Sequence, residues 1–225
     1  MDGRMAEPLP QDPTLDEMRT HLAPRIAAHA AFDGWSDAAV ERAAEELEID
    51  PDQARLAFPK GAADMIDAWF AGIDAEMAAA FSAQELAAMP VHKRIRAAVL
   101  KRIEIARPAR EALRRALAIL AMPQNMPLAA KLSWRSADAM WRLAGDTATD
   151  FNHYSKRGIL AGVYGSTIMA WLDDESEGEA ETIAFLDRRL GNVADFETFK
   201  KRLAGDPDQR FSVTRFLGRL RYPGR

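Results

Sequence analysis

Apolar side chains recur three and four residues apart along almost the whole chain, and this spacing constrains the fold more than any other feature. Met18, Leu22 and Ile26 belong to one such stripe, and Ile95 and Val99 belong to another. This spacing places the side chains on one face of an α-helix. Strand-forming residues are sparse, whereas the good helix formers Ala, Leu, Arg and Glu dominate. The sequence therefore predicts an all-α fold.

Composition excludes several classes of protein. With 48% hydrophobic and 28% charged residues among 225, the chain has enough apolar side chains for a sizeable core. It contains no cysteine, which excludes disulfides, thiol catalysis and cysteine-ligated metal sites. Its net charge of −4 gives no general attraction for nucleic acid. No stretch approaches the roughly 18 apolar residues of a spanning helix. We expect a soluble protein whose membrane contact is peripheral.

Residues 1–13 hold three prolines and four charged residues, and we interpret them as a disordered lead-in rather than a signal peptide. Residues 14–81 predict a long helix, a shorter helix capped by Ser36, a third helix and a fourth that begins near Gly61. Asp50, Pro51 and Gln53 are typical of the start of the third helix. Long, short, short and long helices form a helix-turn-helix layout.

Residues 82–205 predict a helical bundle. Its helices are separated by a proline-bounded break at residues 122–127 and by Gly145, and a helix is expected from Thr149 to Leu172. Two further helices are expected at residues 178–190 and 193–203. Residues 206–225 predict a basic amphipathic tail.

Two groups of segments resemble known families. The spacing of residues 32–61, followed by Met65 and Ile66, resembles the DNA-binding unit of TetR-type regulators. Residues 115–125, 138–146 and 149–164 are similar to the core of the coenzyme Q biosynthesis protein nine family, and the similarity extends over about residues 14–190. The positions that carry it are Trp141, Gly145, Asp146, Asp150, Phe151, Asn152 and Tyr154.

The resemblance implies a TetR-regulator-like fold, with an N-terminal helix-turn-helix unit and a C-terminal helical bundle for ligand binding and dimerisation. It also implies a homodimer that holds an isoprenoid lipid and a partner, the di-iron demethoxyubiquinone hydroxylase. The family's partner-binding surface maps here to Asp146, Asp150, Asn152, His153 and Tyr154. His153 stands where eukaryotic members have tryptophan.

The residues of the helix-turn-helix unit do not favour DNA binding. Residues 32–58 contain eight acidic side chains but only Arg42 and Arg55 as cations, a net charge of −6. DNA recognition needs cations that meet phosphates and side chains that reach base edges. We expect a retained structural module and no nucleic-acid partner.

Methionine and tryptophan gather in the second unit, and methionine adapts to irregular apolar shapes such as a prenyl chain. An apolar stripe of this kind is otherwise typical of ordinary helical core. With the resemblance, the predicted lipid-binding residues are Met122, Met126, Leu132, Trp134, Met140, Trp141, Ile159 and Val163. No cofactor is expected apart from a bound isoprenoid or other long-chain lipid.

Asp150 and His153 lie three residues apart on one helix, a spacing that di-iron bundles use in pairs. A matching second pair is missing from the chain, so a helix-start acid and a surface histidine is the favoured interpretation. We expect no metal site and no catalytic residue.

Small residues recur at Gly158, Ala161, Gly162 and Gly165, which favours either a tight helix crossing inside the subunit or close packing near a dimer interface. The cations of residues 93–107 indicate a solvated helix face that could also attract anionic headgroups.

The tail carries apolar residues at helical spacing together with five arginines after residue 209. Such a helix suits an anionic membrane surface, although docking against the protein's own body or a frayed tail is an equal alternative. The predicted membrane-binding residues are Val213, Arg215, Phe216, Leu217, Arg219 and Leu220.

Together these features predict a non-catalytic lipid-binding accessory protein of ubiquinone biosynthesis. It would bind a prenylated quinone precursor and present it to the hydroxylase, in the bacterial cytoplasm at the surface of the inner membrane. The first alternative is a TetR-type repressor that senses a hydrophobic ligand. A small metal-dependent hydroxylase and a ligand-free interaction module are the others.

Overall fold

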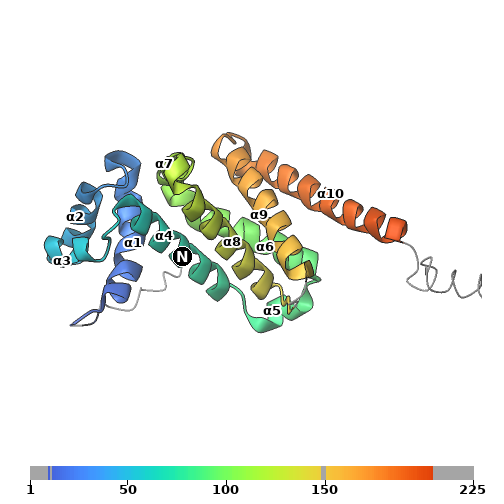
Figure 1. Ribbon diagram of the computed structural model, residues 1–225, viewed down its shortest axis with the longest axis horizontal. Helices are drawn as coiled ribbons and strands as arrows, with labels where there is room; N and C mark the ends of the chain where they lie inside the picture. The colour runs from blue at the N-terminus through green and yellow to red at the C-terminus, as the bar shows by residue number, and fades with distance from the viewer. Residues whose placement is uncertain (1–9, 11, 148–150, 205–225) are drawn as a thin grey trace, which may run out of the picture.

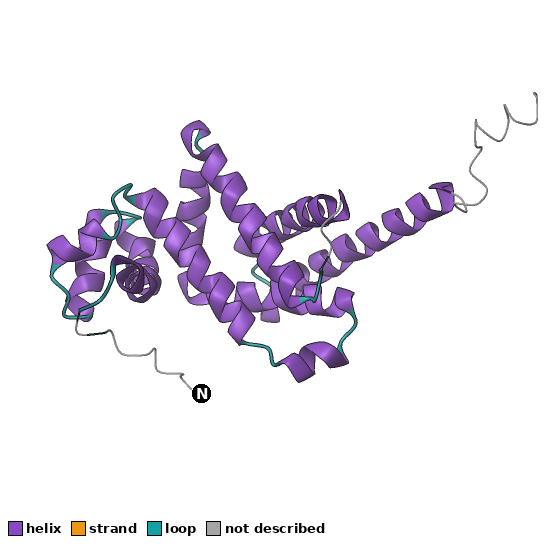
Figure 2. Ribbon diagram, turned by 60° about the horizontal axis from the view of Figure 1, so that its bottom comes forward, coloured by secondary structure: helices purple, strands orange, loops and turns teal. Residues whose placement is uncertain are grey.

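The computed structural model describes residues 10, 12–147 and 151–204, and the side chains of all of these except residues 151–152 and 193–204. Throughout this part of the chain the regular structure is helical (Figure 2), which confirms the predicted all-α class. The α-helices are α1 (Leu15–Asp33), α2 (Asp37–Glu46), α3 (Pro51–Leu56), α4 (Ala62–Ala79), α5 (Ala83–Ala88), α6 (Val91–Ala106), α7 (Arg110–Leu120), α8 (Met126–Leu143), α9 (Phe151–Leu172) and α10 (Ala180–Ala204).

Capping side chains set the starts of α1 and α3, whereas Ser36 precedes α2 as predicted but donates its hydroxyl to the Asp33 carbonyl and makes no side-chain capping bond. Thr14 and Glu17 form a reciprocal capping box at the start of α1, which satisfies amide groups that the helix itself leaves unpaired. The Asp50 carboxylate accepts hydrogen bonds from the amides of Asp52 and Gln53 at 2.8 and 3.1 Å, with Pro51 in the first helical position. The predicted start of the third helix is therefore confirmed.

One continuous hydrophobic core joins the helix-turn-helix segment to the bundle, because α1 packs on α7 and α4 packs on α6 and α8 (Figure 1). Trp35 lies at this junction. Its ring centroid is 5.4 Å from that of Trp69, and its Nε1 donates a hydrogen bond to the Ala112 carbonyl at 3.0 Å. The segments predicted as 14–81 and 82–205 thus share their packing.

Two helices differ from the sequence prediction. The short helix α5 follows Ser82, whose hydroxyl and Glu85 form a capping box that the sequence reading missed. The two helices predicted at 178–190 and 193–203 are one helix, α10, so that prediction was wrong. Gly191 and Asn192 lie between the two predicted helices, but a glycine within a helix costs only about 1 kcal/mol, and α10 continues through both residues.

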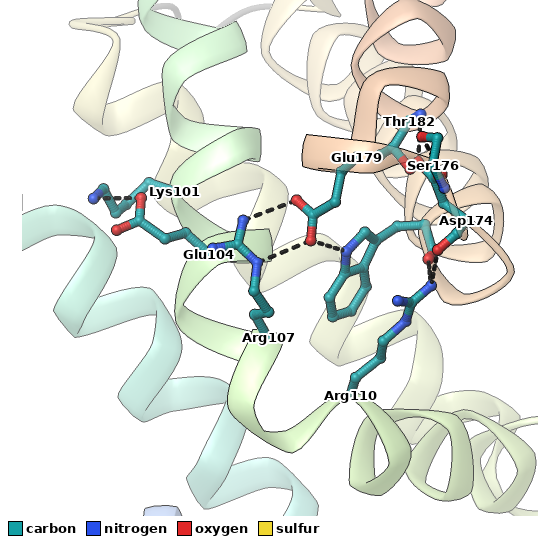
Figure 3. Close-up of polar contacts among 9 residues, drawn as sticks. Lys101, Glu104, Arg107, Arg110, Asp174, Ser176, Glu179 and Thr182 are labelled. Carbon is teal, nitrogen blue, oxygen red and sulfur yellow. Dashed lines mark hydrogen bonds and ion pairs between the residues drawn. The ribbon is translucent and has the colours of Figure 1, made fainter.

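A polar corner fixes the turn between α9 and α10 (Figure 3). Asp174 accepts hydrogen bonds from the amide and hydroxyl of both Ser176 and Thr182, at 2.5–2.8 Å. Glu179 accepts two from Arg107 and one from the indole of Trp171. These contacts tie the start of α10 to the end of α9 and to the segment between α6 and α7.

The hydrogen bonds from Ser176 and Thr182 hold the pKa of Asp174 well below its usual range, and the ion pair with Arg107 lowers the pKa of Glu179. Beyond this corner, α10 packs on α9 and α6, and its far end extends out from the bundle (Figure 1). The predicted tail, 206–225, and most of the predicted lead-in, 1–13, lie outside the described residues.

Candidate functional site

An apolar groove of about 370 Å³ lies between α7, α8 and α9, with Phe70 of α4 in its wall. Its size falls at the lower end of the range for small-molecule sites, roughly 300–1,000 Å³. Three of its lining residues, Ser133, Ser136 and Tyr164, carry a side-chain hydroxyl, and none carries a charge. The lining residues are Phe70, Leu113, Leu117, Leu120, Ala121, Ala129, Leu132, Ser133, Ser136, Tyr164, Gly165, Ile168 and Met169.

Burial separates the floor of the groove from its rim. Leu113, Leu132 and Ile168 are almost wholly buried and form part of the floor, whereas Ser133 and Met169 are exposed and belong to the rim. The apolar stripe of α7 has two roles. Its leucines hold α7 against the core, and they also line the depression between the helices. An apolar molecule in this depression would be shielded from water on several sides.

Ser136 is the polar residue of the floor. Its side chain is 1% exposed, and its Oγ has no hydrogen-bond partner among the described residues. A buried hydroxyl without a partner costs free energy, so in most proteins such groups are satisfied.

A buried group of charges lies beside the groove and connects α4, α6 and α8. Arg102 of α6, 1% exposed, pairs with Asp74 of α4, which also accepts a bond from Arg135 of α8. Arg135 pairs in addition with Asp67. The Arg102 guanidinium lies 5.0 Å from the ring centroid of Tyr164, a wall residue of the groove.

Burial alone would raise the pKa of Asp67, but hydrogen bonds from Lys131 and Arg135 outweigh it and keep the pKa below its usual value. These ion pairs fix α8, which forms one wall of the groove, against α4, which carries Phe70, and Arg102 ties α6 to α4.

The predicted lipid-binding residues are scattered in the structure. Of the eight, Leu132 lines this groove. Met140 and Val163 are buried in the core, while Met122, Met126, Trp134 and Ile159 are exposed. Trp141 is half-buried and donates its indole hydrogen bond to the Lys156 carbonyl at 3.1 Å.

Most of the groove residues were recognisable from the sequence only as helix stripes. The spacing of Leu113, Leu117 and Leu120 predicts one apolar face, but spacing does not show where that face leaves space between helices.

Trp134, His153 and Tyr154 form an aromatic cluster on the outer surface of α8 and α9, here called the aromatic patch. Their ring centroids lie 5.2–6.4 Å apart, and the tyrosine is 62% exposed. Two residues of the predicted partner surface thus meet Trp134, which the sequence placed in the lipid pocket.

The remaining residues of the predicted partner surface differ in position. Asp146 is largely buried and pairs with Lys156 and Arg157 at 2.7 and 3.0 Å. Burial would raise its pKa, but the bonds from these two cations lower it overall. Arg157 also pairs with Asp138, so this cluster fixes the start of α9 against α8. Asp150 and the side chain of Asn152 lie outside the described residues.

The small-residue stripe of α9 faces outward. Gly158, Gly162 and Gly165 are exposed, and a Cβ atom at any of them would contact nothing within 4 Å. The first of the two alternatives, a tight crossing inside the subunit, is therefore wrong for these glycines, because no helix within the described part of the chain covers them.

The basic run of residues 93–107 is solvated only in part, because Lys93 and Arg107 are exposed whereas its other cations are half-buried or buried. Arg94 donates to the carbonyls of Met89 and Ala144, Arg96 pairs with Asp187, and Arg102 is buried. Each of these arginines bonds a group from another part of the chain, so the run stabilises the fold.

In the helix-turn-helix segment, Arg55 of α3 pairs with Glu41 and Asp52. These pairs raise the pKa of Arg55 and occupy the cation that α3 would need to bind a phosphate.

Among the described residues, no group of three or more His, Cys, Asp or Glu side chains is placed to hold a metal ion. Within the same part of the chain, no helix has the length and apolar composition needed to cross a membrane.

The order of the helices, with a helix-turn-helix segment packed on a larger bundle, defines the TetR-type fold. A crystal structure of a TetR transcriptional regulator from Nitrosomonas europaea matches with a TM-score of 0.62 at 24% identity. The match covers 79% of this chain and 98% of that one. The predicted fold class is confirmed.

Within this fold class, residues 126–197, which form α8, α9 and much of α10, match the COQ9 family. The mitochondrial ubiquinone biosynthesis protein COQ9 of Rattus norvegicus is 40% identical over 99 residues, covering 44% of this chain and 32% of the rat protein. Its Xenopus tropicalis counterpart is 26% identical over 178 residues, covering 76% and 56%.

The chain thus matches between about a third and just over half of the length of these two relatives. The resemblance to the COQ9 family that the sequence predicted is confirmed.

Proposed function

We propose that this chain is a lipid-binding accessory protein of ubiquinone biosynthesis. In this proposal, the groove between α7, α8 and α9 holds a prenylated quinone precursor and presents it to the di-iron demethoxyubiquinone hydroxylase. The observation that carries the proposal is an open apolar groove with uncharged walls in a chain similar to ubiquinone biosynthesis proteins.

A carrier of this kind would lower the free-energy cost of moving a prenylated molecule out of the bilayer. Each buried CH₂ group contributes about 0.8 kcal/mol to keeping a prenyl chain out of water. A polyprenyl compound therefore leaves a bilayer only at a large cost in free energy. A protein surface that covers part of the molecule lowers this cost while the ring is transferred to an enzyme.

The aromatic patch supports the proposal that the hydroxylase docks on this chain. Exposed tryptophan and tyrosine side chains are enriched among the residues that dominate binding at protein interfaces. Trp134 and Tyr154 lie on α8 and α9, the helices that form two walls of the groove. A partner bound there would be next to the bound lipid.

A second copy of the chain is the further partner that we propose. The exposed glycines of α9 allow another helix to approach closely, and Ile159 and Met169 on the same helix are exposed apolar side chains. Because Gly165 and Met169 also line the groove, a dimer formed here would cover part of its rim.

The proposed role is non-catalytic, and the lipid is the only small molecule in it. Membrane contact through the basic tail, at the inner membrane of a bacterium, remains part of the proposal, and the curated relatives are mitochondrial proteins. The alternative of a TetR-type repressor is not favoured, because Arg55 of α3 is paired with two acids.

Mass spectrometry of organic extracts from the purified protein tests the lipid. We expect a prenylated quinone or phenol to be present in an amount approaching one per groove. Leu117→Trp, which places a bulky ring in the wall of the groove, is expected to abolish co-purification. Phe32→Trp, at an exposed position of α1 that does not line the groove, is not. Extracts free of lipid, even after incubation with native membranes, would contradict the proposal.

Substitution of the aromatic patch tests the partner. The double variant Trp134→Ala, Tyr154→Ala is expected to weaken binding of the hydroxylase about tenfold or more, because interface aromatics of this kind often contribute 2 kcal/mol or more. Biolayer interferometry with the purified hydroxylase would measure the affinity. Phe32→Ala is the matched control, since this phenylalanine is 85% exposed and lies on α1. Equal affinities for the two variants would exclude the patch as the docking surface.

A further inference from the structure

Arg188 and Arg189 of α10 differ from the other arginines in the described part of the chain, because they form neither an ion pair nor a hydrogen bond there. Both side chains are exposed. The acid next to them, Asp187, does not neutralise them, since its carboxylate accepts two hydrogen bonds from Arg96 at 2.6 and 3.1 Å. This turn of α10 therefore carries two positive charges that the protein leaves uncompensated, although the whole chain has a net charge of −4.

The neighbouring positions on α10 do not compensate these charges either. Side chains three and four residues apart meet on the surface of a helix. Two other exposed arginines, Arg115 and Arg142, each pair with an acid at this spacing. The residues at the same spacing from Arg188 and Arg189 include no acid: they are Ala184, Phe185, Leu186, Gly191, Asn192 and Val193.

Phe185 holds the two guanidinium groups close together. Their central carbons lie 6.0 and 4.9 Å from the centroid of its ring, within the range of cation–π contacts. The three residues line a depression on the surface of α10 together with Gly191 and Asn192. Gly191 contributes no side chain that would cover the depression, and the amide of Asn192 supplies a further hydrogen-bond donor. An anion can therefore approach both arginines without displacing an acid of the protein.

The donors of this depression suit a phosphate group. A guanidinium presents its N–H groups as a planar fork, which matches two oxygens of a phosphate. Because the arginines are exposed, a bound phosphate keeps water on its remaining oxygens, and the cost of desolvating it stays small. The helix α10 lies at an outer edge of the bundle (Figure 1), where both a membrane surface and a soluble molecule can reach it.

We propose that Phe185, Arg188, Arg189 and Asn192 form a phosphate-binding site on α10. None of these residues lines the apolar groove, so the site is separate from it. The phosphate belongs either to the headgroup of an anionic phospholipid or to a soluble phosphate ester. A phospholipid bound here would place α10 against the membrane through the folded bundle itself, in addition to any contact made by the tail.

Sedimentation of the full chain with vesicles tests the site. The vesicles consist of phosphatidylcholine alone or of phosphatidylcholine mixed with the anionic phosphatidylglycerol. The double variant Arg188→Gln, Arg189→Gln removes the two charges. The matched control, Arg42→Gln, Lys60→Gln, removes two exposed cations from the helix-turn-helix segment. A third variant, Arg188→Lys, Arg189→Lys, keeps the charges but loses the planar forks.

We expect the natural chain to bind the vesicles that contain phosphatidylglycerol. The glutamine variant of α10 should bind them about ten- to thirtyfold more weakly, because each arginine at an anionic surface contributes roughly fivefold to the affinity. The control should change the affinity less than about threefold, and the lysine variant should lie between the two. All four proteins should give the same circular dichroism spectrum, since the substituted side chains are exposed.

Soluble glycerol phosphate identifies the source of the phosphate. If isothermal titration calorimetry shows that it binds the natural chain but not the glutamine variant, the site takes free phosphate esters. If it does not bind although the vesicles do, the site requires a headgroup in a bilayer.

Three outcomes would overturn the site. They are equal losses in the glutamine variant and the control, unchanged vesicle binding in the glutamine variant, and a natural chain that binds neither probe. None of these outcomes bears on the apolar groove, because neither probe carries a prenyl chain.

Discussion

Replacing Asp74 with alanine is expected to lower the free energy of unfolding by about 3–5 kcal/mol, the usual cost of removing one partner of a buried ion pair. The substitution leaves the Arg102 guanidinium buried at 1% exposure without the carboxylate that pairs with it. Arg135 loses one of its two acidic partners and retains Asp67. Urea unfolding followed by circular dichroism would measure the change.

Two further variants test whether the loss of stability comes from the unpaired buried charge. Glu76→Ala removes an exposed acid from the same helix and should change the stability by less than about 0.5 kcal/mol. The double variant Asp74→Leu, Arg102→Met should recover much of the loss, since an apolar pair leaves no uncompensated buried charge. A loss below about 1 kcal/mol for Asp74→Ala would show that Arg102 finds other partners or water.

The helices could be predicted because their signals are local. The carboxylate of Asp50 caps α3 from its own chain neighbourhood, and the stripe of Met65, Ile66 and Trp69 marks the buried face of α4 within a few turns. Where a local signal was misinterpreted, the predicted helix boundary was wrong. One predicted helix ends at residue 190 and another starts at 193, but α10 is continuous, and the Ser82–Glu85 capping box that starts α5 is a local signal outside the predicted helices.

The roles of the charged residues could not be predicted, because they depend on partners far away in the sequence. Arg96 pairs with Asp187 and Arg107 pairs with Glu179, which lie 91 and 72 positions further along the chain. Helical spacing alone places both arginines on a solvated face. Only the packing of α10 and of the α9–α10 corner on α6 brings the acids to them.

The candidate groove was only partly predictable, because its shape depends on contacts between helices that are distant in the sequence. Spacing identified Leu132 and the leucines of α7 as apolar, but the space between α7, α8 and α9 arises from how three helices cross. Met140 and Trp134 have similar apolar character in the sequence. They lie on different faces of α8, one in the core and one on the surface, so composition alone could not assign them.

Replacing Asp174 with alanine is expected to cost about 2–5 kcal/mol at pH 7, because it leaves the amide and hydroxyl of the buried Thr182 without an acceptor. The neighbouring Asp173→Ala is the matched control. Its exposed carboxylate forms only a surface pair with Arg114, and its loss should cost less than about 1 kcal/mol. Thermal unfolding of the two variants would separate the corner from the general effect of removing an acid.

The stability that Asp174 contributes to the folded protein should decrease as the pH falls. Its pKa in the folded protein lies well below that of an unfolded aspartate, about 3.9, because Ser176 and Thr182 donate hydrogen bonds to the ionised carboxylate. The stability that it supplies is therefore complete above about pH 4 and is lost progressively as the pH falls below that value. Unfolding of the natural chain and of Asp174→Ala, compared between pH 7 and pH 2.5, should give a stability difference that stays constant down to about pH 4. Below that pH the difference should narrow, since the carboxylate then takes up a proton more readily in the unfolded chain. A difference that widened in acid would mean that the protonated form of Asp174 is the one that the corner stabilises.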